Sequence, residues 1–275
     1  MSHIAEVDAI IEVVRCFESG DIIHVSGSVD PLRDAEVIRT ELILKDLETL
    51  GKAKLRFEKS AKAGDKKASQ VIGLLSRYEK CFDEGRRARQ VSLTAEEKVL
   101  VKEAKFLTDK PILYVANIAE EELGKPDNAP VAALRKKAAE EGSAIIAISG
   151  KVEEEISRLE PGEREEFLKA MSMKESGLDQ LVREGYRLLD LVTFFTVGPT
   201  ENRAWTVARG SSAPEAAGKI HSDFEKGFIR AEVVGYEDFL KYRGEQGARE
   251  NGKFRLEGKD YMVRDGDILH FRFSV

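Results

Sequence analysis

Two polar side chains, Asn117 and Glu120, stand three residues apart directly after the apolar stretch "PILYVA". Such a stretch is typical of a buried strand, and ligands of open α/β sheets bind beyond the carboxyl ends of the strands. An amide and a carboxylate at that edge could hold a purine base, whose ring carries both donors and acceptors. The same two residues could also form an ordinary turn and helix cap, and the spacing leaves both interpretations open.

The loop that would hold phosphates does not occur in the sequence. A P-loop requires Gly-x-x-x-x-Gly-Lys-Ser/Thr, because its backbone N–H groups and lysine hold the phosphates while the hydroxyl binds Mg²⁺. The Gly-Lys pairs of this chain are followed by Ala, Pro, Val, Ile, Phe and Asp. Whichever interpretation of Asn117 and Glu120 holds, the residues predict a chain without a P-loop and without a metal site.

Composition limits the class of protein. The chain has 275 residues, of which 42% are hydrophobic and 34% charged, which predicts a soluble globular protein of one large or two ordinary domains. Without an apolar run of eighteen residues, no membrane span is expected. The two cysteines are too few for a disulfide framework, and we expect them reduced in a cytoplasmic protein. A net charge of −6 argues against a general nucleic-acid binder, and no DNA sequence specificity is expected.

Three apolar stretches, 8–17, 111–117 and 142–149, are typical of buried strands. The residues 128–142 between the last two favour a helix, with Pro130 in its first turn, and this order predicts a parallel crossover. Residues 33–110 carry two long helical patterns joined near Gly64, followed by a further helix. We call residues 33–110 the arm and expect its two long helices to form an antiparallel hairpin.

From about residue 191 the pattern changes to two strands, a helix and further strands. This order in about 80 residues favours a small β-grasp, ubiquitin-like module. The sequence thus predicts an α/β protein with a partial P-loop-type sheet in 1–190, the helical arm 33–110 inserted in it, and a β-grasp module in 191–275.

The arm is more basic than the rest of the chain, with 19 Lys and Arg against 14 Asp and Glu. The excess could simply belong to solvated helix faces, or the arm could meet a polyanion. The arginines Arg86, Arg87 and Arg89 are the candidates for contact with an RNA or another polyanion. No aromatic cluster suited to base stacking accompanies them, so the predicted contact is electrostatic.

Five segments of the sequence together resemble the YchF family of Obg-like ATPases. They are "VDAIIEVVRCF", "DIIHVSGSVDPLRDAEVIRTEL", "PILYVANIAEEEL", "RAWTVARGSSAPEAAGKIHSDFEKGFIRAEVVGYEDF" and "RLEGKDYMVRDGDILHFRFSV". The last two resemble the TGS module that ends such proteins, and the resemblance covers essentially the whole chain. It implies an altered P-loop nucleotide-hydrolase domain, an inserted coiled-coil arm and a TGS domain behind.

The resemblance also assigns roles to residues. Asn117 would hold the base, Ile118 would line it and contact it through its backbone, and Glu120 would replace the Asp with which GTPases select guanine. Ser149 and Gly150 match the second loop that flanks the base. These assignments imply ATP as the nucleotide, with some affinity for GTP, and Mg²⁺ as its companion ion in the full-length family.

His24 follows the first strand in a glycine-flanked loop, and its place in the family makes it a candidate catalytic residue near the γ-phosphate. The resemblance implies a ribosome-associated switch that binds and hydrolyses ATP or GTP in the cytoplasm. Because the P-loop and switch regions are missing, we expect an N-terminally truncated member that is not a competent hydrolase alone. The alternative is a non-catalytic ribosome- or RNA-interaction protein that uses the arm and the TGS domain.

Overall fold

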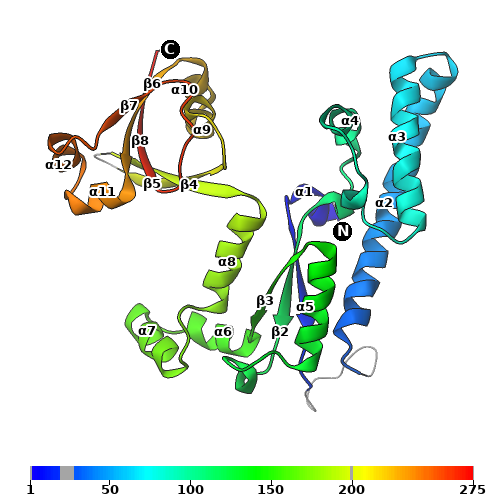
Figure 1. Cartoon of the computed structure of the whole chain (residues 1–275), viewed down its shortest axis with the longest axis horizontal. Coiled ribbons are helices and arrows are strands. Elements are labelled where there is room, and N and C mark those ends of the chain that lie inside the picture. Colours follow the sequence, from blue (N-terminus) through cyan, green and yellow to red (C-terminus); the bar gives the residue numbers. More distant parts are fainter. Residues whose placement is uncertain (1, 19–27, 199–200, 275) are drawn as a thin grey trace. The chain divides into compact units, whose positions relative to one another are not determined.

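The structure is a computed structural model, and it describes residues 2–18, 28–198 and 201–274 (Figure 1). The chain divides into two compact units, Met1–Leu188 and Leu189–Val275. Each unit contains its own sheet and its own buried core. In the described part of the chain, no helix has the length and apolar character needed to cross a membrane.

The sheet of the first unit has the strand order β1-β2-β3, and both pairs are parallel. Helix α5 (Ala129–Glu141) connects the second strand to the third and begins at its N-cap Asn128, as the predicted crossover requires. Because the register aligns the last residues of all three strands, their carboxyl ends form one edge. The strands are β1 (Ile10–Arg15), β2 (Ile112–Asn117) and β3 (Ala144–Ile148).

Helices cover both faces of this sheet. One face packs Tyr114 and Ala116 against Leu134 of α5, and the other packs Val115 against Leu181 of α8. Apart from α5, the described helices of the unit, α8 included, are α1 (Ser2–Glu6), α2 (Pro31–Lys62), α3 (Lys66–Asp83), η1 (Ala88–Gln90), α4 (Ala95–Val101), η2 (Lys102–Ala104), η3 (Leu107–Asp109), η4 (Glu120–Glu122), α6 (Gly150–Ser157), α7 (Pro161–Ala170) and α8 (Gly177–Leu188).

Helices α2 and α3 lie side by side as a long hairpin (Figure 1). Their N-caps are aspartates: Asp30 accepts from the N–H of Arg33, and Asp65 accepts from the N–H groups of Lys67 and Ala68. Such caps satisfy backbone donors that have no partner inside the helix. The two helices share a buried core with the segment that leads into β2.

The third helix expected in the arm is interrupted. Helix α4 ends at Val101, and Lys105 adopts a left-handed backbone conformation with φ 48°. The buried carboxylate of Asp46 on α2 accepts hydrogen bonds from the N–H of Leu107 at 2.6 Å and from the N–H and hydroxyl of Thr108 at 2.9 and 2.6 Å. This tertiary anchor overrides the helical preference of the sequence.

The second unit has a five-stranded mixed sheet with the order β5-β4-β8-β6-β7, in which only β4 and β8 are parallel among the described strands. Helix α9 packs Ala216 and Ala217 against Phe194 and Leu269 of the sheet. The elements are β4 (Leu191–Val197), β5 (Asn202–Ala208), α9 (Ala213–Ile220), α10 (Ser222–Lys226), β6 (Phe228–Gly235), α11 (Tyr236–Lys241), α12 (Glu245–Glu250), β7 (Arg255–Glu257) and β8 (Asp267–Phe273).

The observed architecture confirms the predicted α/β class, with a parallel sheet first and a second, mixed sheet behind it. The names given to the arm and to the TGS domain stay predictions.

Candidate functional site

The carboxyl ends of β2 and β3 bring Asn117 and Gly150 together. The side-chain Oδ1 of Asn117 accepts a hydrogen bond from the backbone N–H of Gly150 at 2.9 Å. A Cβ atom at position 150 would lie 3.4 Å from that oxygen, which is an ordinary van der Waals contact, so this hydrogen bond does not itself require glycine. Since Oδ1 is occupied, the Nδ2 group of Asn117, which has no hydrogen-bond partner in the described part of the chain, remains available as a donor.

Ile118 follows Asn117, and its side chain is buried among the residues that pack under α5. Its backbone N–H already donates to the carbonyl of Ile148 at 2.9 Å. A backbone contact from Ile118 to a ligand is therefore restricted to its carbonyl group.

Glu120 begins η4 at the same edge and is paired with a lysine that the sequence interpretation did not include. Its carboxylate accepts from the Nζ of Lys151 at 2.7 Å. This hydrogen bond raises the pKa of Lys151. Because the Lys151 side chain is 69% exposed, the pair is accessible to solvent and can exchange with a ligand.

Ser149 is buried at the start of α6, and its side chain makes no capping hydrogen bond. Its carbonyl accepts from the N–H of Glu153 at 3.0 Å. Ser149 thus supports the loop through its backbone and packing rather than through its hydroxyl. The structure brings all five predicted base-site residues to one edge, which the strand ends define.

Two residues that sequence reasoning missed hold this edge in place. Glu122 accepts from the side-chain Nδ2 of Asn128 at 2.6 Å and from the N–H of Ala119 at 3.1 Å. Asn128 also donates to the carbonyl of Cys16 at 2.9 Å, which ties the loop to the end of β1. The available signal for Asn128 was its place two residues before Pro130, because an Asn there is a favoured N-cap.

The other predicted site residues behave differently. His24 lies outside the described residues. Arg86 is hydrogen-bonded to Glu84 at 2.8 Å, and Arg89 is exposed with no ion pair or side-chain hydrogen bond to any described residue. Arg87 is only 3% exposed, so it does not have the accessibility that a contact with RNA requires.

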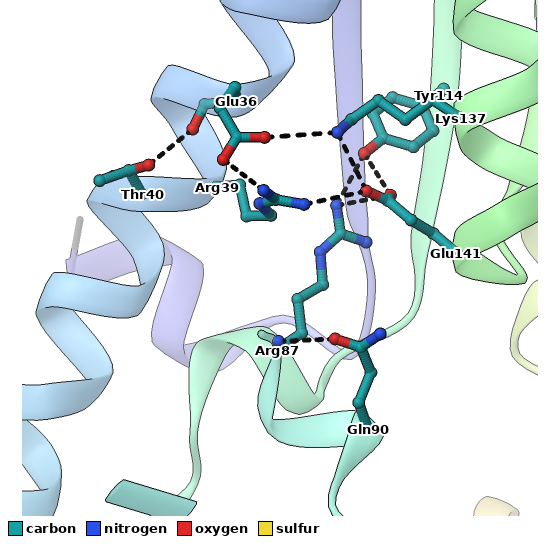
Figure 2. A network of polar contacts seen from close by, with 8 residues as sticks. All are labelled: Glu36, Arg39, Thr40, Arg87, Gln90, Tyr114, Lys137 and Glu141. Carbon is teal, nitrogen blue, oxygen red and sulfur yellow. Dashed lines mark hydrogen bonds and ion pairs between the residues drawn. The ribbon is translucent and has the colours of Figure 1, made fainter. Parts of the chain in front are cut away.

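Arg87 instead belongs to a buried polar network between the arm and the sheet, drawn in Figure 2. Its guanidinium lies 2.9 Å from the carboxylate of Glu141 and donates to the hydroxyl of Tyr114 at 2.7 Å. Lys137 and Arg39 approach the same carboxylate at 3.2 and 3.4 Å. Burial favours the neutral acid, but Arg87, Lys137 and the Tyr114 hydroxyl outweigh it and lower the pKa of Glu141.

Glu12 on β1 lies beside this network and is 7% exposed. Its Oε1 atom has no hydrogen-bond partner in the described part of the molecule. Burial raises the pKa of Glu12 to about 7, and the attraction of Arg87 only partly opposes that effect. Glu12 is therefore a buried acid beside Arg87, whose Nε and Nη1 atoms also have no hydrogen-bond partner in the described part of the molecule.

The family resemblance implies Mg²⁺ as the companion ion of the nucleotide in the full-length proteins. No cluster of three or more His, Cys, Asp or Glu side chains that could hold a metal ion occurs among residues 2–18, 28–198 and 201–274.

Comparisons with known proteins agree with the resemblance seen in the sequence. Residues 191–274 match the family model YchF-GTPase_C, described as "Protein of unknown function (DUF933)". A Bacillus subtilis protein named Ribosome-binding ATPase YchF is 51% identical over 276 residues, which cover 100% of this chain and 75% of the relative. An Escherichia coli O157:H7 protein of the same name is 49% identical over 278 residues, with the same coverage.

The fold has a solved counterpart as well. The Schizosaccharomyces pombe YchF GTPase matches with a TM-score of 0.85 and 32% sequence identity, and the match covers 98% of this chain and 74% of that chain. Identity of about one half along the whole chain, together with this shared fold, shows that the chain belongs to the YchF family.

Proposed function

We propose that the edge formed by Asn117, Glu120 and Gly150 binds the base of a purine nucleotide. The observation that carries the proposal is the bond between Asn117 Oδ1 and the N–H of Gly150, which fixes the side-chain amide. The free Nδ2 group can then donate to an acceptor, and N7 is an acceptor in both adenine and guanine. Asn117 would hold either purine, and the choice between them would fall to its neighbours.

Glu120 supports a preference for adenine. Guanine presents a ring N–H and an amino group that one short carboxylate can accept together, whereas adenine has an acceptor at that ring position. Glu120 is one methylene longer than the Asp of GTPases, and one of its oxygens is bonded to Lys151. We therefore propose ATP as the preferred nucleotide, with affinity for GTP retained.

The names of the relatives extend the proposal to a partner. Both bacterial relatives are named ribosome-binding ATPases, and we propose that this chain is a ribosome-associated nucleotide-binding protein of the cytoplasm. The P-loop consensus does not occur in the 275 residues, so the proposal covers base recognition, and we expect no hydrolysis by this chain alone. The second candidate, a non-catalytic ribosome- or RNA-interaction protein, is favoured by Arg89, which lies exposed in a basic arm and has no ion pair with any residue that the structure describes.

Substitution of Asn117 tests base recognition. Because phosphate contacts are not part of the proposed site, ATP and GTP should bind weakly, and saturation-transfer NMR suits that range. Asn117→Ala should weaken both nucleotides by roughly 1–3 kcal/mol, or about 5- to 150-fold, through the loss of a hydrogen-bond partner. Asn251→Ala is the matched control, because Asn251 is exposed in the second unit. Equal binding by Asn117→Ala and the control would refute the site.

Substitution of Glu120 tests the preference between the two bases. Glu120→Asp should move the ATP/GTP affinity ratio toward GTP, because the shorter carboxylate restores the reach of the GTPase residue. The same NMR titrations measure the ratio. An unchanged ratio would show that Glu120 does not discriminate, and the carbonyl of Ile118 would become the better candidate.

A further inference from the structure

Lys151 joins the two loops that form the base-binding edge. Its Nζ donates to the carboxylate of Glu120 at 2.7 Å, across 31 residues of sequence. Glu120 begins η4 after β2, and Lys151 lies in α6 after β3. The pair of Arg158 with Glu154, by contrast, lies within one helix, where such pairs support the helix itself. The contact of Lys151 is thus made by the meeting of two strand ends.

The stability of the fold does not account for a lysine at position 151. Lys151 is the second residue of α6, Gly150–Ser157. The first turn of a helix carries partial positive charge, so a cation is unfavourable there. The side chains of Lys151 and Glu120 are 69% and 33% exposed, and an ion pair so open to water contributes little to stability. A role in binding is the better explanation for this lysine.

The ammonium group of Lys151 has donors to spare. An ammonium carries three N–H donors and no acceptor. The bond to Glu120 uses one of them, and within residues 2–18, 28–198 and 201–274 the Nζ atom has no second hydrogen-bond partner. The same bond raises the pKa of Lys151, so the side chain stays charged at neutral pH. Charged, solvent-accessible donors are therefore available at the edge that holds Asn117.

The ring nitrogen N1 is the position at which the two purines differ most simply. In adenine it is an acceptor, whereas in guanine it carries a hydrogen and is a donor. A charged donor fixed in the protein therefore forms a hydrogen bond with adenine and meets a second donor in guanine. A mismatch of this kind discriminates between ligands more strongly than a small difference in size, because it leaves polar groups without partners.

We propose that Lys151 selects adenine by donating a hydrogen bond from Nζ to the ring nitrogen N1, and that Glu120 is a positioning residue that holds the ammonium there. The inference rests on the proposed function and deepens it. Asn117 holds N7, which both purines share, and Lys151 binds the ring position at which they differ. Since Glu120 is engaged by Lys151, guanine loses the acceptor that a free carboxylate would offer to its N–H groups.

A nucleotide that lacks the N1 acceptor tests this contact directly. ATP and 1-deaza-ATP, in which C–H replaces the ring nitrogen N1, have the same phosphates and the same N7, so a difference between their affinities reports N1. In saturation-transfer NMR titrations of the full chain, 1-deaza-ATP should bind wild type about 10-fold more weakly than ATP, through the loss of one charge-assisted hydrogen bond.

Lys151→Met removes the donors and keeps the length of the side chain. It should weaken ATP about 10-fold and bring ATP and 1-deaza-ATP to equal affinity. It should also move the ATP/GTP ratio toward GTP, because guanine no longer meets the ammonium. Glu120→Ala should lower the ratio of ATP to 1-deaza-ATP affinity by roughly 3-fold, since Lys151 loses its partner, and should have no further effect on that ratio in the Lys151→Met background.

Two controls accompany these variants. Lys169→Met removes a lysine that is 78% exposed and paired with Glu165 on α7, and it should leave both affinities unchanged. Asn117→Ala should weaken ATP and 1-deaza-ATP equally and keep their ratio, because both nucleotides carry N7.

The outcomes separate the role of Lys151 from the base-binding edge itself. Equal binding of ATP and 1-deaza-ATP by wild type, with binding that still depends on Asn117, overturns the role of Lys151 and leaves the edge in place. An equal loss of both nucleotides in Lys151→Met also overturns it, since the lysine would then contact the phosphates. If wild type binds neither nucleotide, the base-binding edge is refuted, and the inference falls with it.

Discussion

Glu12 is a buried carboxylic acid beside a group of charged side chains whose ion pairs are made with Glu141. Arg87 and Lys137 bind Glu141, and Tyr114 donates to Glu141 at 2.8 Å, so the ionised form of Glu12 gains little compensation for the loss of water. Its pKa is raised from 4.5 to about 7. One pKa unit corresponds to about 1.4 kcal/mol, so ionisation in the folded state costs on the order of 3 kcal/mol.

The sign of the pH dependence follows from this raised pKa. Below about pH 4.5, Glu12 is protonated in both the folded and the unfolded state, so its burial as an ion does not lower the stability of the fold. Between about pH 4.5 and 7 the folded state binds more protons than the unfolded state, so the stability contributed by this group falls as the pH rises. Above about pH 7, Glu12 is ionised in both states, and its ionisation lowers the free energy of unfolding by the full amount.

Glu12→Gln should therefore stabilise the first unit by up to about 3 kcal/mol at pH 8 and change its stability little at pH 4.5. Urea unfolding at the two pH values measures the difference. Glu140→Gln is the matched control, because Glu140 is exposed on the neighbouring helix and should show no such difference. If the Glu12→Gln variant is instead less stable than wild type at pH 8, Glu12 is ionised and bound to Arg87.

The positions of Asn117, Glu120, Ser149 and Gly150 could be predicted from the sequence, because neighbouring parallel strands must end at the same edge. Their hydrogen bonds could not, since the pair between Glu120 and Lys151 depends on how two loops meet. The burial of Arg87 could not be predicted from the sequence either, because it too depends on how distant segments meet. A run of arginines in a sequence is normally expected at the surface. Arg87 is buried because it pairs with Glu141 and Tyr114, which are distant from it in the sequence.

At the scale of elements, Asp46 joins two segments that are far apart in sequence. It sits inside α2 and receives three hydrogen bonds from η3, the segment that feeds β2 and hence the base-binding edge. The sequence pattern placed Asp46 on a helix but gave no sign of its partners. The contact explains why the further helix that the sequence predicted in the arm is broken.

Asp46→Ala should lower the free energy of unfolding of the first unit by about 2–5 kcal/mol, because it leaves two buried N–H groups and a hydroxyl without their acceptor. Urea unfolding followed by circular dichroism measures the loss. The comparison is Asp83→Ala, at an exposed position on α3, which should stay within about 0.5 kcal/mol of wild type. Equal effects of the two substitutions would contradict the anchoring role of Asp46.

At the scale of the whole molecule, the chain consists of two units with separate cores. Leu134 belongs to the core of the first unit and Leu269 to that of the second, and both side chains are fully buried. Since each core closes within its own unit, the two units should unfold as separate cooperative transitions.

A pair of core substitutions tests this independence in the full-length chain. Leu269→Ala should destabilise the second unit by about 2–5 kcal/mol, the usual cost of such a cavity, and leave the first unit unchanged. Leu134→Ala should do the reverse. Hydrogen exchange read by mass spectrometry in increasing urea reports each unit through its own peptides, those of β8 and those of β2. If either substitution lowers the protection of both sets of peptides equally, the units unfold together, and the boundary near residue 189 does not separate independent folding units.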